Sequence, residues 1–229
     1  MYLDNLSNIL RLAQSDGYID RDPTKALYIP RCTSASEGRV LEINEIPTLL
    51  GALEFRERVI AHLAIFVGLR PGEILALQQR HIRDNATRIV IEQRVYAGNI
   101  DDPKTDSSKR TVAVPPATAV LLREWMELVP GEEHAWVFAS ENPVSPLRLE
   151  NLWRRCFKPK LEPYGLEWAT FQVLRRTHAS LGPDAGIDPK VAADQRGHGI
   201  GVSLNVYTKS AFRKKTDAAD QLEKAVLSA

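Results

Sequence analysis

The sequence is poor in the residue types that mark several specialised protein classes. Among 229 residues there are two cysteines, Cys32 and Cys156, far apart and outside any CxxC or Cys/His cluster, so neither a disulfide framework nor a zinc site is expected. No apolar run approaches the roughly 18 residues of a membrane span, and the first twelve residues lack the pattern of a signal peptide. These absences favour a protein of the reducing cytoplasm, with no membrane partner.

An excess of either charge is also missing. The chain has 30 Lys and Arg residues against 29 Asp and Glu residues, a net charge of +1. A surface that binds a polyanion must therefore be local. The 44% hydrophobic and 26% charged residues are typical of a globular protein, and the length suits one medium domain plus a fragment.

The first forty residues indicate a domain boundary. Apolar residues recur at helical spacing from Leu3 to Ala13, which predicts an amphipathic helix whose partners lie outside itself. Turn residues then dominate between Asp22 and Arg39. We expect residues 1–38 to be the end of one domain plus a linker, and residues 39–229 to form a second domain.

The second domain is expected to be mainly helical. Gly68 should end one buried helix, and Pro71 suits the first turn of the next. Helical patterns occupy 43–53, 57–67, 119–128, 148–157, 171–181, 189–196, 202–207 and 211–227. Residues 88–97 and 111–114 read as β-strands and predict an antiparallel hairpin with the polar segment 101–108 at its turn. The predicted fold class is α+β, with a small antiparallel sheet.

Five short motifs occur in a fixed order, although each alone is an ordinary surface feature. They are Gly68-Leu69-Arg70-Pro71-Gly72-Glu73, Pro103-Lys104-Thr105, Leu174-Arg175-Arg176-Thr177, Gly197-His198-Gly199 and Tyr207-Thr208. Together, over roughly residues 39–208, they make the sequence resemble the catalytic domain of the tyrosine recombinases, the phage integrase family. The resemblance implies the integrase or DNA breaking-rejoining fold, with the lysine on the hairpin. It also implies that residues 1–38 are the remnant of an N-terminal core-binding domain that clamps DNA.

The resemblance further implies cleavage and rejoining of DNA through a 3′-phosphotyrosine intermediate. It makes Tyr207 the nucleophile, Lys104 the general acid and His198 a further phosphate ligand, with Arg70 and Arg175 as phosphate clamps. Two guanidiniums suit that task because they donate permanently charged, bidentate hydrogen bonds to non-bridging oxygens. Lys109 and Arg110 compete with Lys104 as proton donors.

Gln172 departs from the family pattern, which usually has a histidine three residues before the second arginine. Residues three apart share a helix face, so the amide can still donate to the phosphate beside Arg175, but it cannot move protons. We expect cleavage to be slower for this reason, and we count Gln172 among the catalytic residues.

Further positions leave alternatives open. Glu73 can orient Arg70 through an ion pair or lie on the surface, and His178 is interpreted as structural. Arg196 replaces a usual leucine, and Gly182-Pro183 interrupts what is often continuous helix.

The expected partners are double-stranded DNA and further copies of the chain. No cofactor or metal is expected, because the phosphotyrosine bond conserves the energy of the broken linkage. In segment 211–229, an apolar stripe indicates a helix that docks either on a neighbouring protomer, giving a dimer or tetramer on DNA, or on its own domain. The expected location is the cytoplasm, associated with the nucleoid. The target site, and the choice between integration, excision and dimer resolution, cannot be predicted.

Three alternatives compete with this interpretation. One is a catalytically weakened DNA-binding relative, suggested by Gln172 and the small net charge. Another is a type IB topoisomerase-like activity that relaxes supercoils, since it uses the same residue types. The third is a helical interaction domain with accidental motifs, in which Arg70, Arg175, His198 and Tyr207 would be scattered.

Overall fold

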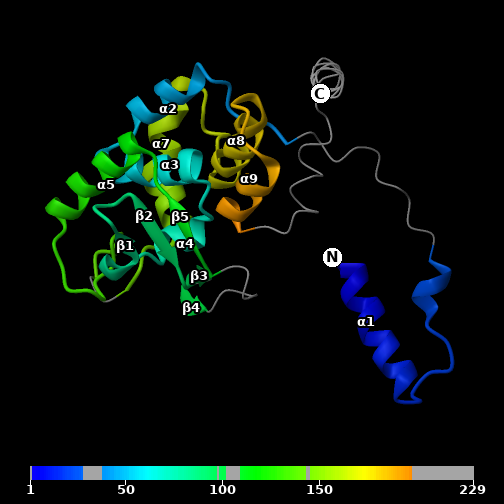
Figure 1. Cartoon of the computed structure of the whole chain (residues 1–229). Coiled ribbons are helices and arrows are strands. Elements are labelled where there is room, and N and C mark those ends of the chain that lie inside the picture. The colour runs from blue at the N-terminus through cyan, green and yellow to red at the C-terminus, as the bar shows by residue number, and fades with distance from the viewer. Residues whose placement is uncertain (1, 28–37, 97, 102–108, 143–144, 198–229) are drawn as a thin grey trace, which may run out of the picture. The chain divides into compact units, whose positions relative to one another are not determined.

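The chain forms two compact units, residues 1–37 and residues 38–229. The computed structural model describes residues 2–27, 38–96, 98–101, 109–142 and 145–197 (Figure 1). Each unit is considered by itself.

The described part of the first unit, residues 2–27, is one long helix followed by a short 3-10 turn. Helix α1 (Tyr2–Ser15) confirms the predicted N-terminal helix, and a 3-10 turn, η1 (Pro23–Ala26), follows it. The Thr24 hydroxyl donates to the Ser7 hydroxyl, which ties the turn back to the helix. Within this unit three apolar side chains of α1 stay exposed: Leu6, Ile9 and Leu12.

The described part of the second unit is mainly helical. The α-helices are α2 (Glu45–Ala52), α3 (Phe55–His62), α4 (Pro71–Leu75), α5 (Pro116–Leu128), α6 (Leu149–Leu152), α7 (Lys158–Leu161), α8 (Phe171–Asp184) and α9 (Pro189–Arg196). Two π-helical segments, η2 (Leu63–Val67) and η5 (Trp153–Phe157), and two 3-10 turns, η3 (Gln79–His81) and η6 (Glu162–Tyr164), connect them. The predicted α+β class is confirmed.

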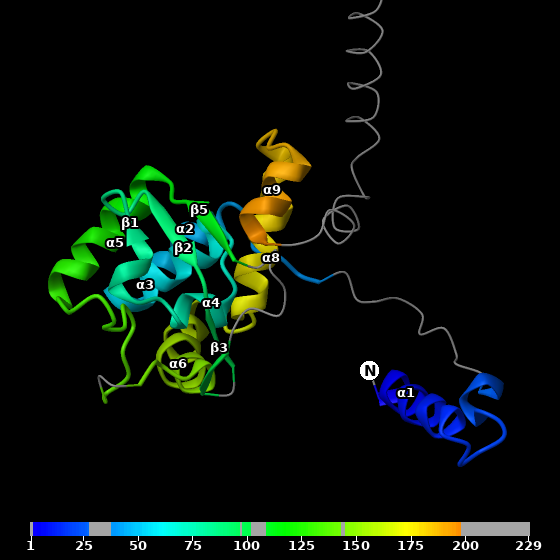
Figure 2. The same ribbon diagram turned by 60° about the horizontal axis from the view of Figure 1, so that its bottom comes forward.

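Three strands form one small antiparallel sheet, in the order β1-β2-β5. They are β1 (Ile82–Arg83), β2 (Arg88–Ile91) and β5 (Arg110–Ala113). Ile89 pairs with Val112 across β2 and β5, and both side chains are buried. Helices α8 and α9 lie on the β5 side of this sheet (Figures 1 and 2), and α9 contacts β5.

The prediction of one strand over residues 88–97 is wrong. Strand β2 ends at Ile91, and the chain then makes a separate hairpin from β3 (Arg94–Tyr96) and β4 (Asn99–Asp101). Gly98, between the paired Tyr96 and Asn99, has φ +84°, a conformation that glycine adopts at little cost. A period-two pattern does not reveal such a change of partner, because both hairpins alternate alike. Segment 102–108, with Lys104, lies outside the described residues.

The core is centred on the chain segment that leads to Arg70. Leu63, Ile65 and Val67 of η2 are completely or almost completely buried, as the sequence predicted for 57–67. Helix α8 packs against η2. Burying each such side chain contributes about 1.5–3 kcal/mol to folding, so this segment is firmly held.

Two helices differ from their predicted form. Segments 57–67 and 148–157 were expected to be regular α-helices, but each ends in five residues of π-helix, which apolar periodicity cannot distinguish from α. The predicted interruption at Gly182-Pro183 is also wrong, because α8 continues to Asp184. Near a helix end a proline removes a single hydrogen bond, and the last turn is kept by Ala185 N–H donating to the Leu181 carbonyl over 3.0 Å.

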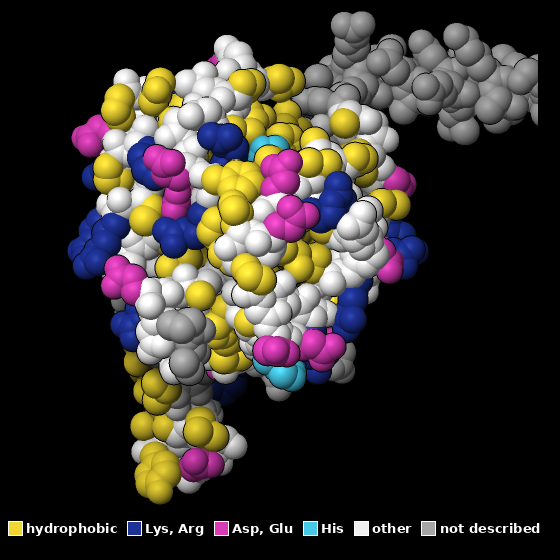
Figure 3. All heavy atoms as spheres, turned by 90° about the vertical axis from the view of Figure 1, so that its left-hand side faces the viewer, with side chains coloured by type: hydrophobic (Ala, Val, Ile, Leu, Met, Phe, Trp, Pro, Cys, Tyr) yellow, Lys and Arg dark blue, Asp and Glu magenta, His cyan; other side chains and the backbone are white. Residues whose placement is uncertain are grey.

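The surface shown in Figure 3 mixes charges of both signs. Lys and Arg side chains there are interspersed with Asp and Glu and with apolar groups, as the small net charge predicts. Among the described helices, none has the length and apolarity that crossing a membrane requires.

Gly68→Ala is expected to destabilise the fold by about 2–3 kcal/mol, because an alanine would be strained at φ +75° and its Cβ would lie 2.6 Å from the His178 ring. The measurement is the free energy of unfolding in urea. Gly165→Ala is the matched control, because Gly165 has φ +66° but open space around it. Equal losses in the two variants would contradict the close packing of Gly68 against His178.

Candidate active site

Arg70 is held at the start of α4. The left-handed Gly68 ends the buried segment, and Arg70 then adopts an extended conformation before Pro71 opens the helix. The Arg70 carbonyl accepts from the N–H groups of Glu73 and Ile74, which fixes the backbone. The Arg70 side chain is 36% exposed, so the guanidinium stands at the surface of a rigid support.

The buried carboxylate of Glu73 holds Arg70 in place through hydrogen bonds. Its side chain is only 4% exposed, so the surface interpretation is wrong and the orienting one is confirmed. Oε1 accepts from Arg70 Nη1 over 2.7 Å, and Oε2 accepts from the Arg70 backbone N–H over 2.8 Å. Burial raises the pKa of Glu73, but the hydrogen bond and charge of Arg110, with those of Arg70, outweigh burial and hold the pKa below its ordinary value. The carboxylate is therefore ionised at neutral pH.

Arg175 lies on α8, and its guanidinium contacts Gly68, two residues before Arg70. Its Nη1 donates to the Gly68 carbonyl, and its Nη2 donates to the Arg196 carbonyl over 2.8 Å. Gly68 thus ends the buried segment, gives room to His178 and accepts from Arg175.

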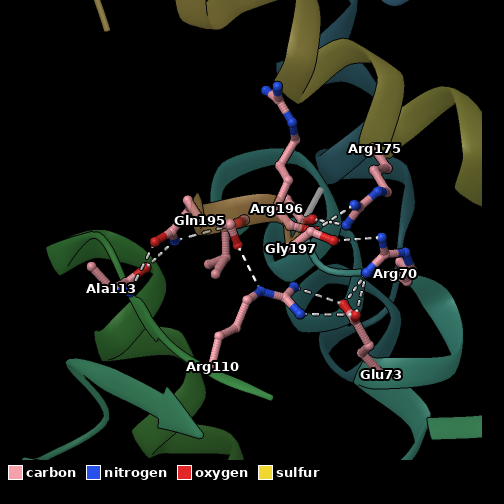
Figure 4. A network of polar contacts seen from close by, with 10 residues as sticks. Arg70, Glu73, Arg110, Ala113, Arg175, Gln195, Arg196 and Gly197 are labelled. Carbon is pink, nitrogen blue, oxygen red and sulfur yellow. Dashed lines mark hydrogen bonds and ion pairs between the residues drawn. The ribbon is translucent and has the colours of Figure 1, made fainter. Parts of the chain in front are cut away.

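The two predicted phosphate clamps meet at the end of α9. Arg70 Nη2 donates to the Gly197 carbonyl over 2.9 Å, and Arg175 Nη2 donates to the carbonyl of the residue before it, Arg196 (Figure 4). Adjacent carbonyls therefore bring together arginines from distant stretches of sequence. The alternative in which Arg70 and Arg175 are scattered over the surface is wrong.

Positive charge accumulates around Arg175. Burial, which is the largest cause, and the charges of Arg70, Arg110 and Arg196 together lower the pKa of Arg175 to about 9, although Glu73 opposes them. Four guanidiniums with a single carboxylate among these groups favour an anion, and a phosphate suits such donors best. The arrangement can bind a phosphodiester and stabilise charge that develops on its oxygens.

The remaining predicted site residues are placed only in part. Gln172 is exposed on α8, one turn before Arg175, and its amide makes no hydrogen bond to any described residue. Lys104, His198 and Tyr207 lie outside the described residues.

The sequence missed the role of Arg110. It was considered as a proton donor, but its guanidinium makes a bidentate pair with Glu73, with both distances 3.0 Å, and donates from Nε to the Gln195 carbonyl. A guanidinium in such a pair is a poor proton donor to a substrate, because these N–H groups already donate within the protein. No spacing signal connects Arg110 with Glu73, since they belong to different elements.

Two other side chains have structural surroundings. Arg196, which replaces an apolar residue of the family pattern, is nevertheless buried, at 2% exposure. His178 Nδ1 donates to the Ile65 carbonyl over 2.9 Å, which agrees with its interpretation as structural. Burial is the main cause that lowers the pKa of His178 to about 4.

Comparison with known proteins gives the family. A profile described as the phage integrase family matches residues 39–214. A "tyrosine recombinase XerC-like" protein of Caldanaerobacter subterraneus subsp. tengcongensis is 25% identical over 251 residues, which cover 95% of this chain and 63% of that protein. The chain therefore spans just under two thirds of the length of this curated relative.

Solved structures share the fold. The Tn1549 transposon integrase in complex with a circular intermediate DNA has a TM-score of 0.80 at 17% identity, over 96% of this chain and 77% of that one. XerA recombinase has a TM-score of 0.63 at 16% identity, over 96% and 82%. A lambda integrase tetramer bound to a Holliday junction has a TM-score of 0.64 at 23% identity, over 86% and 57%.

The fold is thus that of the integrase catalytic domains, as the motifs predicted. The chain belongs to the phage integrase family, the tyrosine recombinases.

Acid is expected to weaken the fold through His178. His178 becomes protonated near pH 4 in the folded chain but near pH 6.5 in the unfolded chain. Between these values protonation stabilises the unfolded state relative to the folded state. The free energy of unfolding should therefore fall by up to about 3 kcal/mol as the pH drops from 6.5 to 4. The measurement is urea unfolding across this range. His178→Gln, which keeps a donor for the Ile65 carbonyl, should show a flatter dependence, and identical slopes would contradict the assignment.

Proposed function

We propose that this chain is the catalytic part of a site-specific DNA recombinase that cleaves and rejoins strands through a 3′-phosphotyrosine intermediate. The observation that carries the proposal is the meeting of Arg70 and Arg175 at the end of α9, in a chain of the phage integrase family. The substrate is double-stranded DNA, because a phosphodiester is the anion that a recombinase must bind and break.

Arg70 and Arg175 are proposed to hold the non-bridging oxygens of the scissile phosphate. Towards the described residues, the Arg70 guanidinium uses one N–H on each Nη, so three of its five donors remain for a ligand. Its partial exposure allows DNA to reach it. Each such donor is worth about 10²–10³ in rate when the surrounding structure fixes it in place.

Tyr207 is the proposed nucleophile. A tyrosine of ordinary pKa near 10 is about one part in a thousand ionised at neutral pH, a deficit of roughly 4 kcal/mol, and nearby guanidiniums offset that deficit. The phenol gives its proton to water, its oxygen bonds to phosphorus, and the 5′ oxygen leaves and takes a proton from Lys104. His198 is a further phosphate ligand. Rejoining reverses these steps, so the energy of the bond is conserved.

Gln172 is proposed to donate a hydrogen bond to the phosphate beside Arg175. Its exposure on the same side of α8 supports this role. An amide cannot accept the tyrosine proton at neutral pH, so the electrostatic lowering of the tyrosine pKa must do more of the work here.

The domain and partner assignments are part of the same proposal. Residues 1–38 are the remnant of the DNA-clamping domain plus linker, residues 39–229 are the catalytic domain, and segment 211–229 takes part in self-association on DNA. The lambda integrase neighbours, described as a dimer on a core site and a tetramer on a Holliday junction, support an assembly of several copies. Association with the nucleoid follows from DNA binding.

A catalytically weakened DNA-binding relative is the second candidate, and Gln172 is the observation that favours it. The recombinases and integrases found by comparison favour neither this candidate nor the topoisomerase-like alternative.

The protein is expected to form a covalent adduct with DNA that survives denaturant. Nicked duplexes tiled across the DNA that flanks the gene are incubated with the full-length protein, so that the cleaved end diffuses away and the adduct is trapped. Tyr207→Phe should abolish the adduct, and Arg70→Gln or Arg175→Gln should slow its formation at least about 100-fold.

Binding to the same duplexes is measured in parallel by titration. Binding without an adduct would support the weakened relative, and relaxation of a plasmid by monomers would support the topoisomerase-like alternative. An adduct that persists in Tyr207→Phe would refute the assigned nucleophile.

Gln172→His is expected to speed cleavage by about 10- to 100-fold, because an imidazole adds general base catalysis that an amide lacks. The measurement is the single-turnover rate of adduct formation from pH 5.5 to 8. The gain should appear only where the new imidazole is neutral, above about pH 6.5. Gln172→Asn is the control, and a rate unchanged by the histidine would show that this position accepts no proton.

A further inference from the structure

Three consecutive carbonyls at the end of α9 are each held by a different arginine. Gly197 N–H bonds back to the Ala193 and Asp194 carbonyls, and no backbone N–H of a described residue reaches the next three carbonyls. Arg110, Arg175 and Arg70 donate to the carbonyls of residues 195, 196 and 197 respectively, over 3.0, 2.8 and 2.9 Å (Figure 4). Arg70 and Arg175 have proposed tasks at the phosphate, whereas Arg110 has none.

Arg110 is also the partner that completes Glu73. Oε1 of Glu73 accepts from Arg70 Nη1 and Arg110 Nη1, and Oε2 accepts from the Arg70 backbone N–H and Arg110 Nη2. Four hydrogen bonds use all the acceptor sites of a carboxylate. The bidentate pair fixes the plane of the carboxylate, and this plane determines where Oε1 directs the Arg70 guanidinium.

A second contact fastens α9 to the same strand. The Gln195 side chain accepts from the Ala113 N–H over 3.2 Å and donates to the Ala113 carbonyl over 2.8 Å. Since β5 is an edge strand, this amide takes the place of a neighbouring strand. Arg110 and Ala113, the two ends of β5, therefore both hold the last turn of α9.

We propose that Arg110 is a positioning residue for DNA cleavage, which fixes Arg70 through Glu73 and holds the end of α9 between the two phosphate-binding arginines. This proposal rests on the proposed function. With a side chain 8% exposed, Arg110 stabilises the geometry from behind and does not contact the substrate. The same guanidinium therefore joins β5 to Glu73 of α4 and to the last turn of α9.

The loss of Arg110 should leave the buried Glu73 with half of its hydrogen bonds. The Arg70 guanidinium is then free to turn, and a displacement of about 1 Å in a catalytic group can cost roughly 100-fold in rate. DNA binding depends on many phosphate contacts and should change little.

The test uses the full-length protein and the nicked duplex that gives an adduct with the wild type. Arg110→Gln should slow single-turnover cleavage about 10- to 100-fold, with a change below about threefold in the Kd for DNA. Arg110→Lys should also be slow, because an ammonium lacks the planar fork that pairs with both Glu73 oxygens while Nε reaches the Gln195 carbonyl. The acid limb of the pH profile should move to higher pH, because Glu73 loses the partner that most lowers its pKa. Arg88→Gln, on the adjacent strand β2 with an exposed side chain, is the matched control and should match the wild type.

A double variant separates positioning from simple stabilisation. Glu73→Gln with Arg110→Met removes both buried charges, so the urea midpoint should return towards that of the wild type. Cleavage should stay slow, because Arg70 still lacks its anchor. Recovery of cleavage together with stability, or a wild-type cleavage rate in folded Arg110→Gln, would overturn the proposal.

Amide hydrogen exchange tests the role of Arg110 independently of the proposed recombinase function. Arg110→Gln should increase the exchange of amides in residues 190–197, whereas Arg88→Gln should not. If the wild type forms no adduct, the proposed function fails, and the exchange result still decides whether Arg110 holds α9. Unchanged exchange would show that it does not.

Discussion

The end of a short helix is the constraint on which the rest of this site depends. A helix leaves its last carbonyls without partners, and burying them unpaired is costly. In α9 the carbonyls of residues 195–197 receive hydrogen bonds from three arginines, each on a different element. The negative end of the helix dipole reinforces these contacts. Helix α9 therefore ends where residues of β5, α8 and the start of α4 converge on it.

The same contacts explain how guanidiniums of like charge stay close together. Carbonyl oxygens and the Glu73 carboxylate replace part of the water that these groups lose. The compensation is incomplete, since burial and its neighbours lower the pKa of Arg175 to about 9. An anion relieves this repulsion, so the positive charge is concentrated where a phosphate can use it. A net charge of only +1 is thus compatible with a phosphate site, because the excess is local.

Local features of the fold were predictable, and contacts between distant segments were not. Apolar periodicity located the helices, and Gly68 and Pro71 marked the junction at Arg70, because these signals act within a few residues. The motifs selected Arg70 and Arg175, which the structure brings together. Glu73 remained ambiguous and Arg110 was misjudged, because their roles depend on a pairing across 37 positions. The second hairpin and the π-helical segments were missed because their patterns resemble those of regular elements.

Burial separates two tasks that one residue type performs here. Arg110 and Arg70 share one carboxylate, yet their side chains are 8% and 36% exposed. The enclosed arginine donates to Glu73 from both Nη atoms and to the Gln195 carbonyl from Nε, so all three of its nitrogens are committed to the protein. The more exposed Arg70 guanidinium donates a single N–H to the same carboxylate, and its remaining donors include some that can reach solvent. Because a guanidinium has five donors in a plane, the number committed to the protein decides whether it supports the site or binds a ligand.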